Sequence, residues 1–162
     1  MLPDNGQTPP PTRPTGTNFR ISLVCGARIV SVERTVSVSR ERATERLPVA
    51  RALLRQLRRS PAADESAAGF STAIPHDLRV NSRAPGDPKE ALRLNRPLDE
   101  LPPFSLAQLA CTLEGTAADG DHGVVLGGPV GGDREPVRRY ECGTLKRDPR
   151  GAPSMGERVP SG

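Results

Sequence analysis

Glycine and proline interrupt this chain so often that most of its helices and strands must be short. The 162 residues include 16 glycines and 18 prolines, against 34 residues of the large apolar types Leu, Ile, Val and Phe. The aromatic residues, which bury the most area each, are three Phe and one Tyr. We therefore expect one folded domain, residues 18–145, with loose ends on either side.

A β-hairpin is predicted near the N-terminus. Between Phe19 and Val38, apolar and polar residues alternate on both sides of a break at 25–27 that contains a glycine. A period of two across such a break is typical of two antiparallel strands. Residues 1–17 contain five prolines and are expected to form a disordered or polyproline-like lead.

A helix is predicted after the hairpin, beginning near Thr44. Pro48 suits its first turn and Ser60-Pro61 ends it. Its apolar face is Val49, Ala50, Leu53, Leu54 and Leu57, and its basic face is Arg51, Arg55, Arg58 and Arg59. A basic amphipathic helix could bind an anionic membrane or nucleic acid. We favour the alternative of a surface helix with its arginines in water, because the arginine excess runs through the whole chain.

The positive charge is local. The chain has a net charge of +4, yet residues 20–59 alone hold ten Arg against three Glu. Such a field attracts anionic partners by simple charge attraction. Recognition of nucleic-acid bases is disfavoured, because residues 20–59 contain no aromatic residue and only Phe19 adjoins them.

The rest of the chain is harder to interpret. Prolines recur through 61–104, where the sequence predicts a loop at 81–88 and a short helix around 89–94. The end of the chain is rich in Gly and Pro, so residues 146–162 are expected to form a disordered tail.

The cysteines and the N-terminus indicate a cytoplasmic protein. Cys25, Cys111 and Cys142 form no C-x-x-C pair, and no histidine lies at zinc-ligand spacing, so we expect reduced thiols. The first residues lack the charged and apolar regions of a signal peptide, and no apolar run approaches the roughly 20 residues of a membrane span.

Two apolar segments flank a polar loop between 115 and 121. The spacing within Ser105–Glu114 fits either a helix or a strand, while Val124–Leu126 is bounded by glycines and predicts a strand. The string 119–122, Asp-Gly-Asp-His, brings two carboxylates and an imidazole together. These groups could bind a divalent cation or position a proton, although such strings most often form solvated turns.

This block resembles part of the flavin reductase-like, split-barrel FMN-binding family. The similarity lies in a Leu-Ala-x-Leu-x-Cys pattern at 106–111, a Gly-Asp-His at 120–122 and a glycine at 127. The resemblance implies a mainly β fold, an antiparallel split barrel with one or two short helices, in which Ser105–Glu114 is a strand. It also implies a homodimer that binds FMN or FAD and takes hydride from NADH or NADPH, with a monooxygenase as a partner.

The resemblance also implies roles for individual residues. His122 would position the nicotinamide or the flavin ring, Asp121 would fix the loop, and Gly120 and Gly127 would allow close backbone approach. Cys111 would face the barrel core as a small apolar residue. A looser similarity downstream implies that Arg139 and Tyr140 contact the flavin or its phosphate, with a solvated Arg139 as the alternative.

The similarity covers only about residues 98–145. Gly128-Pro129 interrupts the strand that the family continues, and the N-terminal half lacks a counterpart of the family's Thr/Ser-rich strand and Asp-Pro-Pro segment. The sequence thus predicts a diverged or incomplete reductase component. The alternative is a non-enzymatic, largely disordered basic protein that binds nucleic acid or anionic surfaces weakly through residues 20–59. A Ser-His-Asp hydrolase is disfavoured because the chain has no G-x-S-x-G.

Overall fold

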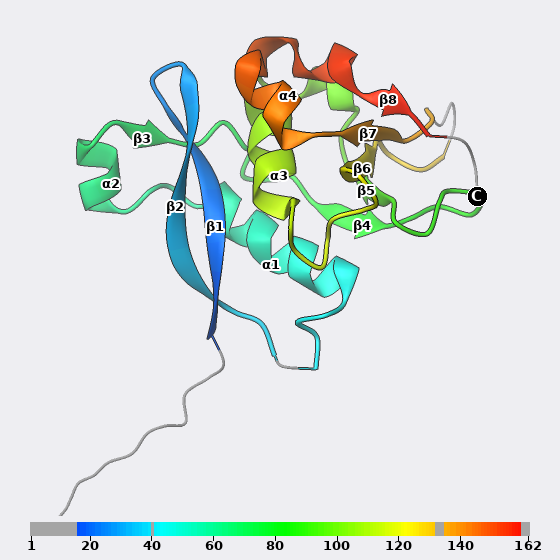
Figure 1. Ribbon diagram of the computed structural model, residues 1–162, viewed down its shortest axis with the longest axis horizontal. Helices are drawn as coiled ribbons and strands as arrows, with labels where there is room; N and C mark the ends of the chain where they lie inside the picture. Colours follow the sequence, from blue (N-terminus) through cyan, green and yellow to red (C-terminus); the bar gives the residue numbers. More distant parts are fainter. Residues whose placement is uncertain (1–15, 40, 132–134, 160–162) are drawn as a thin grey trace, which may run out of the picture.

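Two open β-sheets and a few short helices make up the computed structural model, which describes residues 16–39, 41–131 and 135–159 (Figure 1). The strand orders are β2-β1-β3 and β4-β5-β6-β7-β8, and no closed barrel is found among these residues. Helices are about as prominent as strands, so the expectation of a mainly β fold holds only in part. Most of the proline-rich lead, residues 1–15, lies outside the described residues.

The first sheet is built on a long hairpin, which confirms the prediction from the alternating pattern. Strands β1 (Gly16–Cys25) and β2 (Arg28–Ser37) pair antiparallel along their whole length. Gly26 has a φ of 63°, the left-handed conformation that the tight turn needs and that glycine adopts at little cost. The short strand β3 (Phe70–Ser71) pairs with the last two residues of β1.

The predicted amphipathic helix is also confirmed, as α1 (Arg46–Arg58). Its buried residues are Val49, Ala50, Ala52, Leu53, Leu54 and Leu57. Leu53 and Leu57 are fully buried, and burial of such a side chain contributes roughly 1.5–3 kcal/mol. Because the apolar face packs in the core, the arginines of α1 are left on its outer side.

The second sheet consists of β4 (Val80–Ser82), β5 (Leu92–Leu94), β6 (Val124–Gly127), β7 (Arg138–Tyr140) and β8 (Glu157–Arg158). Strands β5 and β6 are parallel, and the other neighbours are antiparallel. Strand β6 confirms the prediction for 124–126. The short helix predicted around 89–94 is wrong, because all three residues of β5 are buried in the sheet.

Residues 146–159 of the predicted disordered tail form regular structure, and residues 160–162 lie outside the described residues. The segment 146–159 runs from the end of α4 (Cys142–Arg147) into the 3₁₀ helix η3 (Pro149–Met155) and β8. The Val159 N–H donates to the Val137 carbonyl at 3.1 Å, and the Val159 side chain is buried. The remaining short elements are α2 (Ala63–Ala67) and the 3₁₀ helix η2 (Leu98–Glu100).

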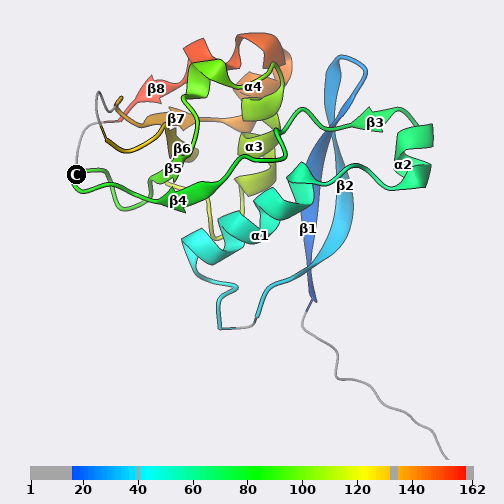
Figure 2. The same cartoon turned by 180° about the vertical axis from the view of Figure 1, so that it is seen from behind.

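Helix α3 (Ser105–Leu113) lies between the hairpin and the second sheet, as both views show (Figures 1 and 2). The strand that the family resemblance implies for this segment is therefore wrong. Eight of its nine residues are buried, and only Cys111 is partly exposed. A helix that is surrounded by protein can be apolar all round, so it lacks the exposed polar face that usually identifies a helix.

The few polar side chains of α3 hydrogen-bond to the neighbouring edge of β1. The Ser22 N–H donates to Thr112 Oγ1 at 3.0 Å, and Gln108 Nε2 donates to the Ser22 carbonyl at 3.0 Å. Gln108 Oε1 also accepts from the Ala73 N–H at 2.7 Å. Strand β3 pairs only with Val24 and Cys25 and does not reach Ser22. The side chains of α3 therefore supply the hydrogen bonds that the backbone of Ser22 would otherwise make to a neighbouring strand.

Candidate functional site

The Gly-Asp-His string forms a tight turn between α3 and β6. The Gly120 N–H donates to the Gly123 carbonyl at 3.0 Å, and His122 has a φ of 65° with an exposed side chain. Both oxygens of the Asp119 carboxylate accept backbone N–H groups, from Gly115 at 2.8 Å and Gly120 at 2.9 Å. The hydrogen bonds of the turn therefore explain why these residue types occur in this string, without a ligand.

Glu90 joins this turn to β7. Its Oε2 accepts from the Asp121 N–H at 2.9 Å, and its Oε1 accepts from Arg139 Nη2 at 2.9 Å. The structure thus brings Gly120, Asp121 and Arg139 together, as the flavin hypothesis requires. The Asp121 N–H and the Arg139 Nη2 group are used within the protein, because both donate to the Glu90 carboxylate.

Gly127 allows a close approach, but the group that approaches it belongs to this chain. A Cβ at Gly127 would lie 2.7 Å from Nη1 of Arg93 and 2.7 Å from Cγ1 of Val137. Glycine is therefore needed at this place to let the buried Arg93 side chain pass β6.

Tyr140 is fully enclosed, with 1% of its surface exposed. Among the described residues, its hydroxyl has no hydrogen-bond partner. Burial raises the pKa of Tyr140 to about 12; among the smaller effects, the charge of Arg138 lowers this pKa and that of Glu135 raises it. The side chain has the surroundings of a core residue.

We expect Tyr140→Phe to abolish a loss of stability at alkaline pH. In the unfolded chain the phenol titrates near pH 10. The folded state keeps its proton up to about pH 12, so the free energy of unfolding falls between pH 10 and 12, by about 2–3 kcal/mol. Urea unfolding at pH 9 and pH 11.5 measures this fall in both proteins. At pH 7 the variant should be at least as stable, because it loses an unpaired hydroxyl; equal alkaline losses would contradict the assignment.

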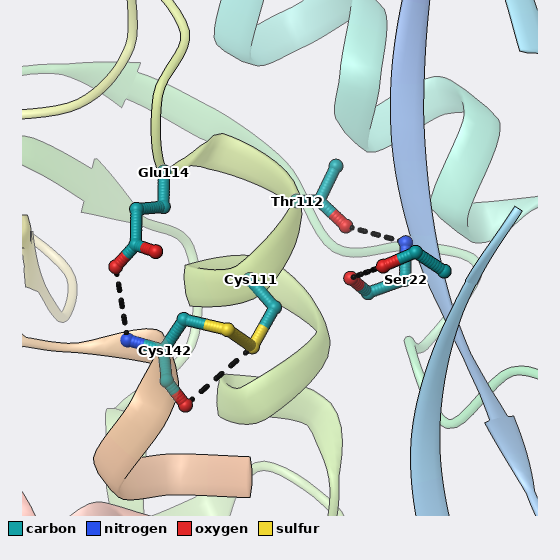
Figure 3. The surroundings of a disulfide bond; sticks show 6 residues. Ser22, Cys111, Thr112, Glu114 and Cys142 are labelled. Carbon is teal, nitrogen blue, oxygen red and sulfur yellow. Dashed lines mark hydrogen bonds between the residues drawn. A yellow bond between two sulfur atoms is a disulfide. The ribbon is translucent and has the colours of Figure 1, made fainter. Parts of the chain in front are cut away.

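Cys111 and Cys142 form a disulfide that connects α3 to α4 (Figure 3). The expectation of three reduced thiols is wrong for this pair, and Cys111 is not the small apolar core residue that the resemblance implies. The Cys142 N–H also donates to Glu114 Oε2 at 3.2 Å, which holds the start of α4 against the end of α3. Cys25 is the free cysteine.

A cavity of about 440 Å³ lies between α1 and β4, which run side by side (Figure 2). We call it the arginine cavity, and its lining residues are Arg51, Leu54, Arg55, Arg58, Arg79, Val80, Asn81 and Asn95. None of the predicted flavin-site residues lines it. Three of its arginines are four and three residues apart on α1, so they share one face of the helix.

Backbone carbonyls at the free edge of β4 and just before it orient three of the four arginines. Arg58 Nη1 and Arg79 Nη1 both donate to the Leu78 carbonyl, at 3.0 and 3.2 Å, and Arg51 Nε donates to the Val80 carbonyl at 3.0 Å. The intervening carbonyl, of Arg79, accepts from Asn95 on the opposite side. An edge strand needs such cover for its unpaired carbonyls. Each guanidinium has five N–H donors, so most of them stay free for a ligand.

Positive charge accumulates in the arginine cavity. Burial lowers the pKa of Arg58, and repulsion from Arg79 and then from Arg55 lowers it further. Arginine nevertheless stays protonated. The ion pairs of the described residues involve other arginines, so no carboxylate of a described residue lies within 4 Å of the guanidinium nitrogens of these four.

A second cavity, of about 620 Å³, is lined by residues of α1 and of the segment before it. Arg51 and Arg55 line both this cavity and the arginine cavity. Glu45 also lines the second cavity, and its carboxylate opposes the binding of an anion. The arginine cavity is the better anion site because its lining residues include no acidic side chain.

Sequence reasoning found the α1 arginines and interpreted them as a solvated face, and Arg51 and Arg55 are indeed exposed. It missed Arg79, Asn81 and Asn95, which come from a segment without a readable period. The sequence signal for the arginine cavity is the spacing of Arg51, Arg55 and Arg58, which places the three side chains on one face of the helix.

Within the described ranges, no three potential metal-ligating side chains gather, and no helix has both the length and the apolar character of a membrane span. No protein-family model, curated protein or solved structure matches this chain.

Proposed function

We propose that this protein binds phosphate-bearing anions in the arginine cavity, as a binding module and not as an enzyme. The observation that carries the proposal is that four arginines from α1 and the edge of β4 line one hollow and have no carboxylate partner among the described residues. The other lining side chains are amides and aliphatic groups. This set supplies hydrogen-bond donors and positive charge, which suit binding better than proton transfer.

Guanidinium groups held in place bind phosphate better than free ones do. The fixed fork of arginine matches two phosphate oxygens, and each charge-assisted bond is stronger than a neutral one. The carbonyls of Leu78 and Val80 already orient three of the four guanidiniums, so less side-chain entropy is lost when an anion binds. The proposal refines the predicted anionic binding through residues 20–59 by adding Arg79 from outside that range.

The first test is Arg58→Gln. We expect this variant to bind inorganic phosphate about tenfold or more weakly, because a hydrogen bond to a charged group contributes about 1.5–3 kcal/mol. Isothermal titration calorimetry at low ionic strength measures the change. The affinity of the unaltered protein should also fall as salt is added.

Arg59→Gln is the matched control. Arg59 is the next residue, it is exposed, and it lines a different hollow with Arg34 and Gln56. Both variants lose one positive charge. If phosphate binds at a local site, Arg58→Gln lowers the phosphate affinity and Arg59→Gln leaves it nearly unchanged. Equal losses would show a general charge effect, and no saturable phosphate binding would overturn the proposal.

The flavin reductase hypothesis, with its split barrel and homodimer, stays a prediction. Comparison of FMN with riboflavin separates it from anion binding. If only the arginine cavity binds, FMN binds through its phosphate, Arg58→Gln weakens it, and riboflavin does not bind. If His122 lies at a flavin site, riboflavin also binds, His122→Ala weakens both flavins, and NADH or NADPH bleaches the bound flavin.

A further inference from the structure

The outer edge of β2 is the longest strand edge that no described residue covers. The two sheets end at β2, β3, β4 and β8, and the last three strands have only two or three residues each. Strand β2 has ten residues, pairs with β1 without a bulge, and contains no proline. Both views show β1 between β2 and α3, so α3 does not cover this edge (Figures 1 and 2). A long edge without such protection is a template for pairing with another strand.

Every second residue of β2 directs its backbone groups outward. The N–H and carbonyl of Ser22 in β1 bond to side chains of α3, so they point away from β2. Ser31 lies directly opposite Ser22, and in an antiparallel ladder the two members of such a pair both point away from each other. The backbone groups of Ile29, Ser31, Glu33 and Thr35 therefore face outward. Among the described residues, they have no backbone hydrogen-bond partner.

The core-side face of this edge is incompletely covered. Val30 and Val32 are partly exposed, although the residues opposite them in β1 are fully buried. A strand that pairs with β2 would cover these valines. Arg34 lies on the same face, where an inward-pointing charge can prevent edge pairing. Its charge is compensated within the chain by an ion pair with Glu65, so it leaves the edge open to a partner.

The sequence of β2 suits pairing with a second copy of itself. In a two-fold antiparallel pair, residues that point outward meet residues that point outward. If Val32 lies opposite Val32 of the second copy, Ser31 lies opposite Glu33, residues 28–36 all pair, and no like charges meet. The neighbouring registers, two residues to either side, place Glu33 opposite Glu33 or Arg28 opposite Arg34. Like charges directly opposite each other destabilise a strand pair, so one register is favoured.

We propose that two copies of this protein pair antiparallel along β2, with Val32 opposite the same residue of the second copy. The two three-stranded sheets then form one continuous sheet. The outward groups make about eight hydrogen bonds across the interface, and the two Val32 side chains form a cross-strand pair. No residue of β2 lines the arginine cavity, so this interface is independent of the proposed function.

Sedimentation velocity over about 5–200 μM protein measures the association. We expect a monomer–dimer equilibrium with a Kd in the micromolar range, because the interface is small. Hydrogen exchange followed by NMR locates the interface without a variant. The amides of Ser31, Glu33 and Thr35 should exchange severalfold more slowly at high than at low protein concentration. The Val32 amide should change less, because it faces β1 in both states.

The variant Ser31→Glu tests the register. Ser31 is exposed, so the variant should fold. In the dimer each new carboxylate lies opposite Glu33 of the other copy, and we expect the Kd to rise about tenfold. Ser37→Glu is the matched control, because it adds the same charge at an exposed position of the same strand, beyond residues 28–36. Its Kd should stay within about twofold of the original value.

A double variant distinguishes the registers. Ser31→Glu combined with Glu33→Ser exchanges the two side chains, so each serine again faces a carboxylate and the Kd should return close to its original value. In the register with Ser31 opposite Ser31, the two new carboxylates would instead face each other and the dimer would stay weak.

Three results would contradict this interface. A protein that stays monomeric at about 200 μM does not pair through β2. A dimer that Ser31→Glu and Ser37→Glu affect equally, or in which the Ser31 and Glu33 amides exchange at the same rate at all concentrations, uses another surface. A dimer that Ser31→Glu weakens and the double variant does not restore has another register, and the alignment at Val32 is then wrong.

Discussion

Replacement of Arg93 by methionine is expected to lower the free energy of unfolding by about 3–5 kcal/mol. Arg93 lies in β5 and is 1% exposed. Its Nε and Nη2 donate to the two carboxylate oxygens of Asp87 at 2.8 Å each, and its Nη1 donates to the Glu135 carbonyl at 2.9 Å. Methionine keeps the apolar stem of the side chain, but it leaves the buried carboxylate without this countercharge.

Urea unfolding measures the loss, and Arg96→Met is its matched control. Arg96 forms an ion pair of the same length, 2.8 Å, with Asp77, but these side chains are 38% and 55% exposed. Exposed ion pairs contribute about 0–1 kcal/mol, so the control should lose little stability. Equal losses in the two variants would contradict the importance that we assign to burial.

A double variant separates charge from packing. Asp87→Asn removes the carboxylate charge and keeps an oxygen that can accept the Ala84 N–H, which bonds to Asp87 Oδ2 at 2.8 Å. In the Arg93→Met background it should restore part of the lost stability, because the buried charge is then gone. If the second substitution only adds to the loss, the cost of Arg93→Met lies in packing.

The sequence predicts those parts of the fold in which one face of an element meets water. The alternation in β1 and β2 and the leucine stripe of α1 both reflect a buried side opposite an exposed one. Strand β5 has no such contrast. Arg93 is charged yet buried between two leucines of β5, and its partner Asp87 is six residues away on a loop. A charged residue in a sequence normally indicates an exposed position, so the sequence of β5 gives the wrong indication at Arg93.

Helix α3 shows how a family resemblance can outweigh a local signal. Its apolar residues fit both periods, but its polar residues Ser105, Gln108 and Thr112 are three and four residues apart, as on one side of a helix. All three hydrogen-bond to β1 or to the 72–73 segment. Polar residues inside an apolar segment therefore carry information about its period, because a buried polar group needs a partner.

The candidate site could be predicted only in part for a similar reason. The α1 arginines stand out in the sequence, but their role depends on the edge of β4, which brings Leu78 and Arg79 to them from about twenty residues along the chain. No local pattern encodes that contact. The disulfide is equally non-local, since the spacing of three cysteines does not say which two of them meet.

Reduction of the Cys111–Cys142 disulfide is expected to lower the free energy of unfolding by roughly 3–4 kcal/mol. The bond closes a loop with a sequence separation of 31, and loop-closure entropy for that length gives roughly this value. Thermal unfolding with and without dithiothreitol measures the effect. Cytosolic thiols are usually kept reduced, so a structural disulfide counts against the predicted cytoplasmic location, which stays untested.

Variants assign the loss to this bond. The double substitution Cys111→Ser and Cys142→Ser should unfold at the same lower temperature with or without dithiothreitol. Cys25→Ser should behave like the unaltered protein in both conditions, because Cys25 forms no disulfide. If dithiothreitol reduces the bond, as mass spectrometry would show, and the unfolding temperature does not change, then the packing of α3 against α4 holds this part of the fold without the disulfide.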